Sequence, residues 1–294
     1  MQIKQKKGFY SLIHTYRDGG VKNFEKYIGK TKPSSQDKEK FIYEYVNHRW
    51  LKEINELQTI YASKKNTTSD LLQKKNLRSF GVRFTHNTNK IEGSKLSKGD
   101  TRTILEDGII PANSKANDVI ETKAHMQVYE QMISNQETLS FGLILNYHKQ
   151  IFQLTKPNHA GSFRNGPVTI GGSDYTPPPS RFEVDLMLKD LMEWYFSKKK
   201  IYNPVFLAAI FHFRFVSIHP FEDGNGRITR LLTNYILFWR DFPLYDLDAK
   251  YRKAYYNALE RSNMKNNEMY FISWFFPRYI TYIKKIMTSL GYLT

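Results

Sequence analysis

The residues whose types could do chemistry are concentrated in one segment, Ser217–Arg230. His219 is the one side chain there whose ordinary pKa suits a general base at neutral pH. Asp223, four residues further on, offers a hard carboxylate oxygen for a magnesium ion, which binds one or two carboxylates together with phosphate oxygens. Arg227 and Arg230 are three residues apart, so on a helix they share a face and can bind two phosphate oxygens. This combination predicts a site for phosphoryl or nucleotidyl transfer.

The glycines of the same segment indicate a tight turn that leads into a helix. Gly224 and Gly226, with Asn225 between them, let backbone N–H groups converge on an anion, and the helix N-terminus adds its positive end. A preceding helix should end near Val216, because a residue that stands before proline, as His219 does, avoids helical dihedrals. A plain helix–turn–helix would explain the glycines, but not the histidine, the aspartate and both arginines together. The chain contains no G-x-x-x-x-G-K-[ST] sequence, which excludes a P-loop nucleotidase.

From His219 to Arg230 the sequence reads H-x-F-x-D-G-N-G-R-x-x-R, and this resembles the signature of the Fic family without departure. The resemblance extends over roughly residues 85–280. It includes stretches similar to the family's flap and nucleotide pocket, namely Gly161–Arg164, Val168–Gly171 with Pro177–Pro179, and Tyr255, Tyr256, Leu259 and Asn263.

The resemblance implies an enzyme, a protein adenylyltransferase that moves AMP from ATP to a Ser, Thr or Tyr hydroxyl of a target protein. It assigns catalysis to His219, Asn225 and Arg227, with His219 deprotonating the target hydroxyl. Asp223 would hold Mg²⁺ or Mn²⁺. ATP would be bound by the cradle residues Gly224, Asn225 and Gly226 and by the arginines Arg227 and Arg230.

Two further groups of residues are implied to bind ATP or to face it. The flap residues Val168, Thr169 and Ile170 would also align the target by adding its backbone to an exposed strand edge. Leu259 and Asn263 would face the adenine, with Tyr256 beside them. The alternative for the flap is an ordinary surface hairpin, and the alternative for Leu259 is plain helix packing.

An upstream stretch, Thr88-x-x-x-Glu92-Gly93, resembles the inhibitory motif of family members that carry an N-terminal inhibitory helix. Thr88 and Glu92 are four residues apart and so share one helix face, and Gly93 suits a helix end. The resemblance implies that Glu92 pairs with Arg230 and inhibits the chain. In some members the same glutamate positions water to remove AMP. A de-adenylylating phosphodiesterase that acts on AMP-modified proteins, or a bifunctional enzyme, is therefore the alternative.

The elements that must position these residues are mainly helical. Phe9–Tyr16 and Val21–Ile28 flank an Asp-Gly-Gly turn and predict an N-terminal β-hairpin. After residue 97 helices dominate, apart from the Gly- and Pro-rich stretch Gly161–Pro179, where we expect a small hairpin. The predicted fold is a mainly α, Fic-like helical bundle with a β-hairpin flap. We expect a basic N-terminal region over 1–80 and a catalytic domain over 81–294, which includes the inhibitory helix near 85–93.

Composition narrows the class of protein. The 294 residues include no cysteine, which excludes disulfides, cysteine zinc sites and a cysteine nucleophile. No apolar run reaches the eighteen or more residues of a membrane span, and the basic N-terminus lacks the apolar region of a signal peptide. We therefore expect a cytoplasmic protein without membrane contact.

The charge is strongly positive, with 44 Lys and Arg against 28 Asp and Glu, a net of +16. This favours as a further alternative a non-catalytic, basic nucleic-acid-binding regulator, but no helix-turn-helix reader, zinc finger or RNP motif is recognisable, which argues against nucleic acid. Residues 1–80 hold 17 basic and 8 acidic residues, more than half of the excess. Our hypothesis is that this region recruits an acidic partner. A homodimer is expected only by analogy with the family.

Overall fold

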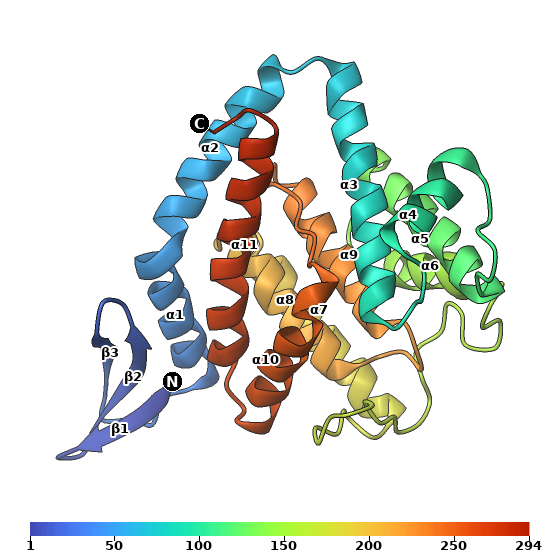
Figure 1. Ribbon diagram of the computed structural model, residues 1–294. Helices are drawn as coiled ribbons and strands as arrows, with labels where there is room; N and C mark the ends of the chain where they lie inside the picture. Colours follow the sequence, from blue (N-terminus) through green and yellow to red (C-terminus); the bar gives the residue numbers. More distant parts are fainter. Residues whose placement is uncertain (294) are drawn as a thin grey trace.

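The computed structural model describes residues 1–293 and begins with a three-stranded antiparallel sheet. Its strands are β1 (Gln2–Lys6), β2 (Phe9–Arg17) and β3 (Val21–Gly29), in the order β1-β2-β3. The predicted hairpin is confirmed as β2 and β3, and β1 is an additional strand. Alternate residues face opposite sides of a strand, so buried Leu12 faces the protein while Ser11, opposite Lys4 and Tyr27, faces outward. The sheet lies beside the first helix (Figure 1).

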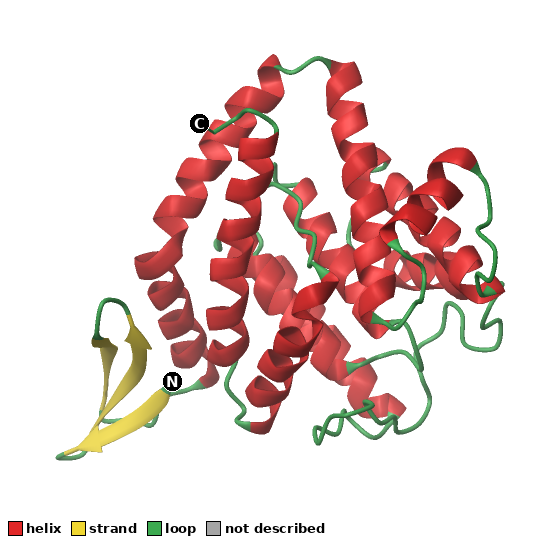
Figure 2. Cartoon of the chain, viewed as in Figure 1, coloured by secondary structure: helices red, strands yellow, loops and turns green. Residues whose placement is uncertain are grey.

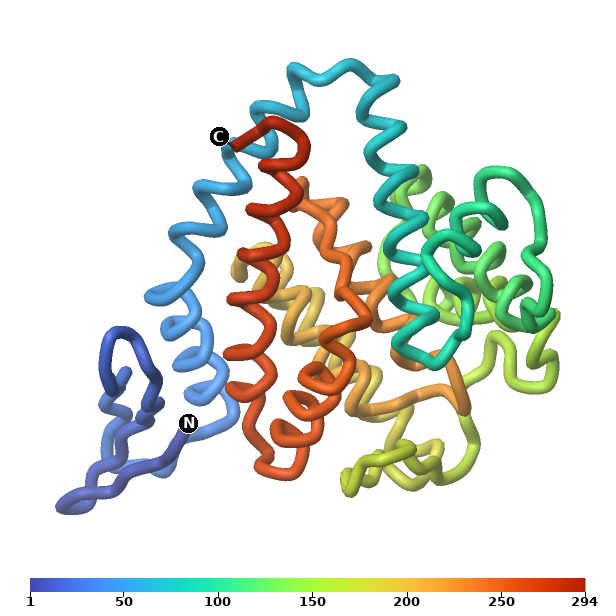
Figure 3. Tube along the Cα trace, in the orientation of Figure 1, coloured from blue at the N-terminus to red at the C-terminus, as the bar shows by residue number. Residues whose placement is uncertain are grey.

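Three long helical segments follow the sheet. They are α1 (Ser35–Val46), α2 (Lys52–Thr67), which a π-helical turn over Asn47–Leu51 joins to α1, and α3 (Asp70–Ile91). α2 and α3 run in opposite directions from one apex, and the tube in Figure 3 shows the C-terminal end of the chain returning to α2. α11 (Met269–Ser289) lies between these two helices (Figure 1).

The boundary expected between residues 80 and 81 falls inside α3, because one continuous helix runs from Asp70 to Ile91. The helices before it bury their apolar side chains in the same core as the rest of the chain. Trp50, for example, stacks on Phe276 of α11 with ring centroids 5.2 Å apart. Residues 1–80 and residues 81–293 therefore share one hydrophobic core.

A second group of helices packs against α3. It comprises α4 (Lys98–Arg102) and α5 (Ala116–Ser134), and Thr103–Asp107 continues α4 as a π-helical turn. α6 (Phe141–Phe152) packs in turn on α5. α4 starts at a capping box, in which Ser97 and Asp100 each accept a hydrogen bond from the other's backbone N–H. Figure 2 shows these helices together on the side opposite the sheet.

The centre of the fold is formed by α8 (Pro204–Ile218), which is buried on nearly all sides. It starts with an Asn203 cap and Pro204 in the first turn, where a proline lacks no needed hydrogen bond. α9 (Asn225–Phe238) follows α8 after a short turn and packs against it. α7 (Arg181–Lys198) also packs against α8. α10 (Arg252–Met264), which a short 3₁₀ turn (Ala249–Tyr251) precedes, leads into α11. The turn between α8 and α9 is the segment whose chemistry the sequence singled out.

The hairpin expected at Val168–Ile170 is not formed, which corrects that part of the predicted fold. Residues 163–178 contain no strand, and Figure 2 draws them as a loop between α6 and α7. A turn is closed there by a 3.0 Å hydrogen bond from Ser173 N to Ile170 O. Glycines and prolines on both sides leave no neighbouring stretch that could pair as a second strand. The flap is therefore a loop.

The fold class agrees with the prediction, since the chain is mainly helical with one small antiparallel sheet at its N-terminus. Among residues 1–293, every helix is too short or too polar to span a lipid bilayer.

Candidate active site

The turn between α8 and α9 is held in one shape by its own residues. Asn225 closes it, because its side-chain oxygen accepts from Phe221 N and its amide donates to Phe221 O, both at 2.8 Å. Gly224 has a φ of 84°, and a Cβ there would collide with the ring of Phe152. Glycine is required at that position for both reasons. Both polar atoms of the Asn225 side chain therefore help to shape the turn.

His219 ends α8 in the left-handed region, with a φ of 52°. Its Nδ1 lies 3.2 Å from the carbonyl oxygen of Val216. A carbonyl oxygen can only accept, so this contact assigns the proton to Nδ1 and leaves the lone pair on Nε2. Burial lowers the pKa of His219 below its ordinary value of 6.5. At neutral pH the ring is therefore uncharged and has a free basic nitrogen.

An anion site is formed where α9 begins. The first N–H groups of α9 point out of the helix without an intrahelical acceptor, and the helix dipole adds positive potential there. Arg227 and Arg230 lie on the first turns of α9 and are both buried. Within residues 1–293, Nε of Arg227 and Nη1 of Arg230 have no hydrogen-bond partner. Buried polar groups are rarely left unpaired, so these two N–H groups are available to a bound anion.

The guanidinium of Arg230 is also bound by α3, the helix that carries the inhibitory motif. Nε of Arg230 donates to Thr88 Oγ1 at 2.7 Å, and Nη2 donates to Glu92 Oε1 at 2.5 Å. Gly226 leaves the space for this pairing, because a Cβ on it would collide with Oε1 of Glu92. The structure thus pairs Glu92 with Arg230, as the family resemblance implied, and adds Thr88 as a second partner of the same guanidinium.

Asp223 lies at the rim of the anion site. Its Oδ2 is 3.4 Å from Nζ of Lys156, and its Oδ1 is 3.7 Å from Nη2 of Arg227. Burial opposes the charge of Asp223, but Arg227 and Lys156 outweigh it and hold the pKa of the carboxyl below its ordinary value. Residues 1–293 contain no group of three His, Cys, Asp or Glu that could enclose a metal ion. A single ionised carboxylate fits an ion that takes its remaining ligands from phosphate and water.

Two residues outside the motif hold the turn in place, and the sequence prediction did not assign them this role. His148 of α6 accepts from Gly161 N at Nδ1 and donates from Nε2 to Asp223 O, both at 3.0 Å. Its ring stacks on Phe221 with centroids 3.8 Å apart. Arg164 donates from Nε to His219 O at 2.7 Å. In the sequence, Arg164 was marked only by the resemblance of Gly161–Arg164 to the family's flap region, and no motif pointed to His148.

The flap and α10 are joined beside the site. Glu260 of α10 accepts from Ser173 Oγ and from Asp174 N, the latter at 2.8 Å. In this flap loop, Val168 and Ile170 are half-buried and Thr169 is exposed. This connection brings the flap loop next to the helix that carries the remaining predicted nucleotide residues.

Those residues of α10 differ in their surroundings. Tyr256 donates to Ile91 O at 3.3 Å, which places its hydroxyl next to the end of α3. Leu259 is buried in the core, so part of its side chain packs as the alternative interpretation expected. The side-chain oxygen of Asn263 accepts from Ser217 Oγ at 2.8 Å.

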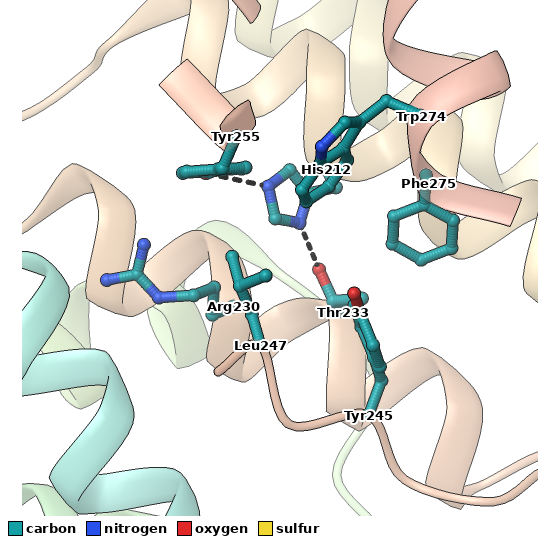
Figure 4. Close-up of a pocket in the computed structure, with 8 residues that line it drawn as sticks. All are labelled: His212, Arg230, Thr233, Tyr245, Leu247, Tyr255, Trp274 and Phe275. Carbon is teal, nitrogen blue, oxygen red and sulfur yellow. Dashed lines mark hydrogen bonds between the residues drawn. The ribbon is translucent and has the colours of Figure 1, made fainter. Parts of the chain in front are cut away.

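His212 lies near Arg230 and is buried in the core. Figure 4 shows its ring between Tyr255 and Thr233, with both ring nitrogens hydrogen-bonded at 2.9 Å. Burial lowers the pKa of His212 to about 3, so the ring is neutral. It supports the face of the core from which Arg230 extends.

Comparison with known proteins agrees with this geometry. Residues 138–237 match the model of the Fic/DOC family. The protein adenylyltransferase fic-1 of Caenorhabditis briggsae is 31% identical over 225 residues, which are 74% of this chain and 43% of that protein. The protein adenylyltransferase Fic of Nematostella vectensis is 32% identical over 183 residues, which are 60% of this chain and 42% of that protein. This chain therefore spans less than half the length of these relatives.

Solved structures share the fold. A Fic domain containing signaling protein from Bacteroides thetaiotaomicron superposes with a TM-score of 0.72 at 26% identity, covering 81% of this chain and 97% of that one. Fic-1 of Caenorhabditis elegans, residues 134–508, gives a TM-score of 0.74 at 24% identity, covering 84% of this chain and 74% of that one. The fold and the motif are those of a Fic domain. The chain belongs to the Fic/DOC family.

Proposed function

We propose that this chain is a protein adenylyltransferase that moves AMP from ATP to a Ser, Thr or Tyr hydroxyl of a target protein. One observation carries the proposal. A neutral His219 with a free Nε2 ends α8, and one turn later α9 begins with two arginines that each keep an unpaired buried N–H. A base beside an anion site is what nucleophilic attack on a phosphate ester needs. The names of the adenylyltransferase relatives support the same reaction.

In the proposed reaction, Nε2 of His219 takes the proton of the target hydroxyl while the hydroxyl oxygen attacks the α-phosphorus of ATP. The bond from the α-phosphorus to the bridging oxygen breaks, and its electron pair leaves with pyrophosphate. The hydrogen bond from Nδ1 to Val216 O keeps the ring oriented while it carries the extra proton. The amides of α9 and the free N–H groups of Arg227 and Arg230 neutralise the phosphate oxygens.

A divalent ion fits the rim of this site. Asp223 would hold Mg²⁺ or Mn²⁺, because its carboxylate is ionised and half-exposed. When bound, the ion would supply positive charge to the phosphates of ATP. Nearby, His148 keeps the backbone of Asp223 in place through its hydrogen bond to the carbonyl oxygen.

The position of the label in ATP tests the reaction class. With the Glu92→Gly chain, we expect label from the α-phosphate to stay on protein through a denaturing gel, because AMP becomes covalently bound. Label from the γ-phosphate should be lost with pyrophosphate, and mass spectrometry should find one AMP per modified hydroxyl. Retention of the γ-label would instead indicate a kinase, and retention of neither would contradict the proposal.

We further propose that Glu92 inhibits the chain in its resting state. The carboxylate of Glu92 lies against Gly226 and takes one nitrogen of Arg230. A phosphate that approached the same arginine would meet a negative charge and lose a donor. The chain would then bind ATP in an unproductive way until Glu92 moves.

The outward face of the N-terminal sheet is our candidate for docking of the target. The register places Lys4 and Lys6 of β1 on the same face as Phe9 of β2 and Tyr27 of β3. These side chains, with Lys7, line a hollow of about 350 Å³, and Tyr27 is 62% exposed. Within residues 1–293, none of the three lysines has an ion-pair partner. Three lysines against one carboxylate, Glu25, leave an excess of positive charge around the hollow, and this suits an acidic segment of the target.

Charge reversal tests this docking face. We expect Lys4→Glu, Lys6→Glu and Lys7→Glu together to reduce AMP transfer to lysate proteins about tenfold, because rim charges mainly control encounter. Labelling of the chain itself should change less than about twofold. The matched control reverses three exposed lysines of α2 and α3, Lys64, Lys74 and Lys75, with the same change in net charge. Equal loss in both variants would contradict a role of the sheet.

A further inference from the structure

A polar cavity adjoins the anion site. Its volume is about 330 Å³, and its walls include Asp223 and Arg227 of the motif together with Glu121 and Lys156 from outside it. Glu121 belongs to α5, and Lys156 follows the end of α6. The cavity therefore joins the predicted phosphate-binding residues to groups that the motif does not contain.

Glu121 connects two cations at the bottom of this cavity. Its Oε2 accepts from Nη1 of Arg227, and its Oε1 accepts from Nζ of Lys156 and from Thr155 Oγ1, the last at 2.8 Å. Burial opposes the charge of Glu121, but Arg227 and the donated hydrogen bonds outweigh it and hold its pKa below the ordinary value. The carboxylate is thus ionised and carries two positive partners.

The two cations differ in their freedom to move. The side chain of Arg227 is 6% exposed and that of Lys156 is 29% exposed. Both lie over the ring of Phe152, with Cζ of Arg227 at 4.4 Å and Nζ of Lys156 at 4.9 Å from its centroid. A lysine has four rotatable bonds and a compact charge, so Lys156 can turn within the cavity while Arg227 stays packed.

The ammonium of Lys156 already lies at the rim of the anion site. It bridges Glu121 and Asp223, with Nζ 3.4 Å from Oδ2 of Asp223. Its backbone is fixed, because Lys156 N donates to Phe152 O at 2.7 Å and Lys156 O accepts from Ala160 N at 3.0 Å. Only the side chain of Lys156 needs to rotate for its ammonium to reach a nucleotide phosphate bound next to Asp223.

We propose that Lys156 is a third cationic group of the phosphate site and binds the β- and γ-phosphates that leave as pyrophosphate. This inference rests on the proposed adenylyl transfer. When the bond to the α-phosphorus breaks, its electron pair goes to an oxygen of the β-phosphate, and the ammonium of Lys156 stabilises that charge without transferring a proton. In the resting chain Glu121 and Asp223 hold the ammonium next to the place where this charge develops.

Binding of ATP and AMP to chains that cannot turn over tests the inference. In a Glu92→Gly, His219→Ala background, we expect Lys156→Met to weaken ATP binding about tenfold, the scale of one charge-assisted hydrogen bond. AMP binding should change less than about twofold, because AMP lacks the two phosphates that Lys156 contacts. Isothermal titration calorimetry measures both affinities, and Lys156→Arg should restore part of the ATP affinity.

The control is Lys123→Met, which removes the same charge from an exposed position of α5 outside the cavity. Unchanged ATP affinity in Lys156→Met, or equal weakening of ATP and AMP, would overturn the role of Lys156. AMP transfer is measured separately with Glu92→Gly alone. If that chain transfers no AMP although Lys156 still discriminates ATP from AMP, the proposed function fails and the phosphate contact remains.

Discussion

Glu92→Gly is expected to raise the rate of AMP transfer about 10- to 100-fold, the equivalent of one or two charge-assisted hydrogen bonds. In the wild-type chain Nη2 of Arg230 donates to Glu92 and Nε donates to Thr88, so Nη1 is the guanidinium nitrogen without a partner. Removing the carboxylate frees one N–H of Nη2, which also donates to Thr88 O at 3.2 Å, and removes a negative charge that lies against Gly226. Glycine tolerates the backbone of this helix end, where Glu92 has a φ of −83°.

Incorporation of α-labelled ATP, measured for the wild type and the variant at equal concentration, checks this expectation. Glu92→Gln keeps the size of the side chain and loses its charge, so it should retain much of the gain if electrostatics is the cause. A variant no faster than wild type would contradict inhibition by Glu92. Chains labelled beforehand give a second result, since faster loss of AMP from wild type than from Glu92→Gly would support the de-adenylylating alternative.

The part of the site that the sequence predicted is the part that local geometry determines. His219 to Arg230 span one turn and the start of one helix, so their relative positions depend on a few dihedral angles. Pro220 and Gly224 constrain that turn directly. The pairing of Glu92 with Arg230 is long-range, and only the resemblance to a family motif allowed it to be predicted.

The residues that support the motif from other elements could not be predicted in this way. Glu121 lies more than a hundred residues before Arg227, the residue with which it pairs, and a lone glutamate on a helix is ordinarily a surface residue. His148 lies on an amphipathic helix, where a histidine is usually part of the core. Contacts of this kind depend on how whole helices pack, which residue spacing does not encode.

The sequence prediction differs from the structure at two β elements, and the physical reason differs between them. β1 was missed because its polar side chains, among them Lys4 and Lys6, lack the β-branched and aromatic pattern of a strand. The flap was predicted as a hairpin from the β-branched run Val168–Ile170, but a strand forms only where a partner can pair with it. The run Val168–Ile170 has a high β propensity, but it forms no strand because no neighbouring stretch pairs with it.

His219→Ala is expected to lower AMP transfer about 10³-fold in the Glu92→Gly background, within the range that general bases contribute. The imidazole is held in place for this role, since Nδ1 donates to Val216 O at 3.2 Å and Arg164 holds the backbone oxygen of His219 at 2.7 Å. Without it, the target hydroxyl keeps its proton and is a poor nucleophile. ATP affinity should stay nearly unchanged, because His219 is not among the groups that bind the phosphates, and calorimetry measures it separately.

The pH dependence distinguishes a base from a residue that only positions the substrate. Burial lowers the pKa of His219 below 6.5, so its basic form persists to more acidic pH than in a free histidine. The rate should be flat near neutral pH and fall about tenfold per pH unit below that pKa, because the protonated ring cannot accept the hydroxyl proton. His159→Ala, an exposed histidine, should leave the rate and the profile unchanged. If the acid limb persists in His219→Ala, another group is the base and the proposed mechanism is wrong.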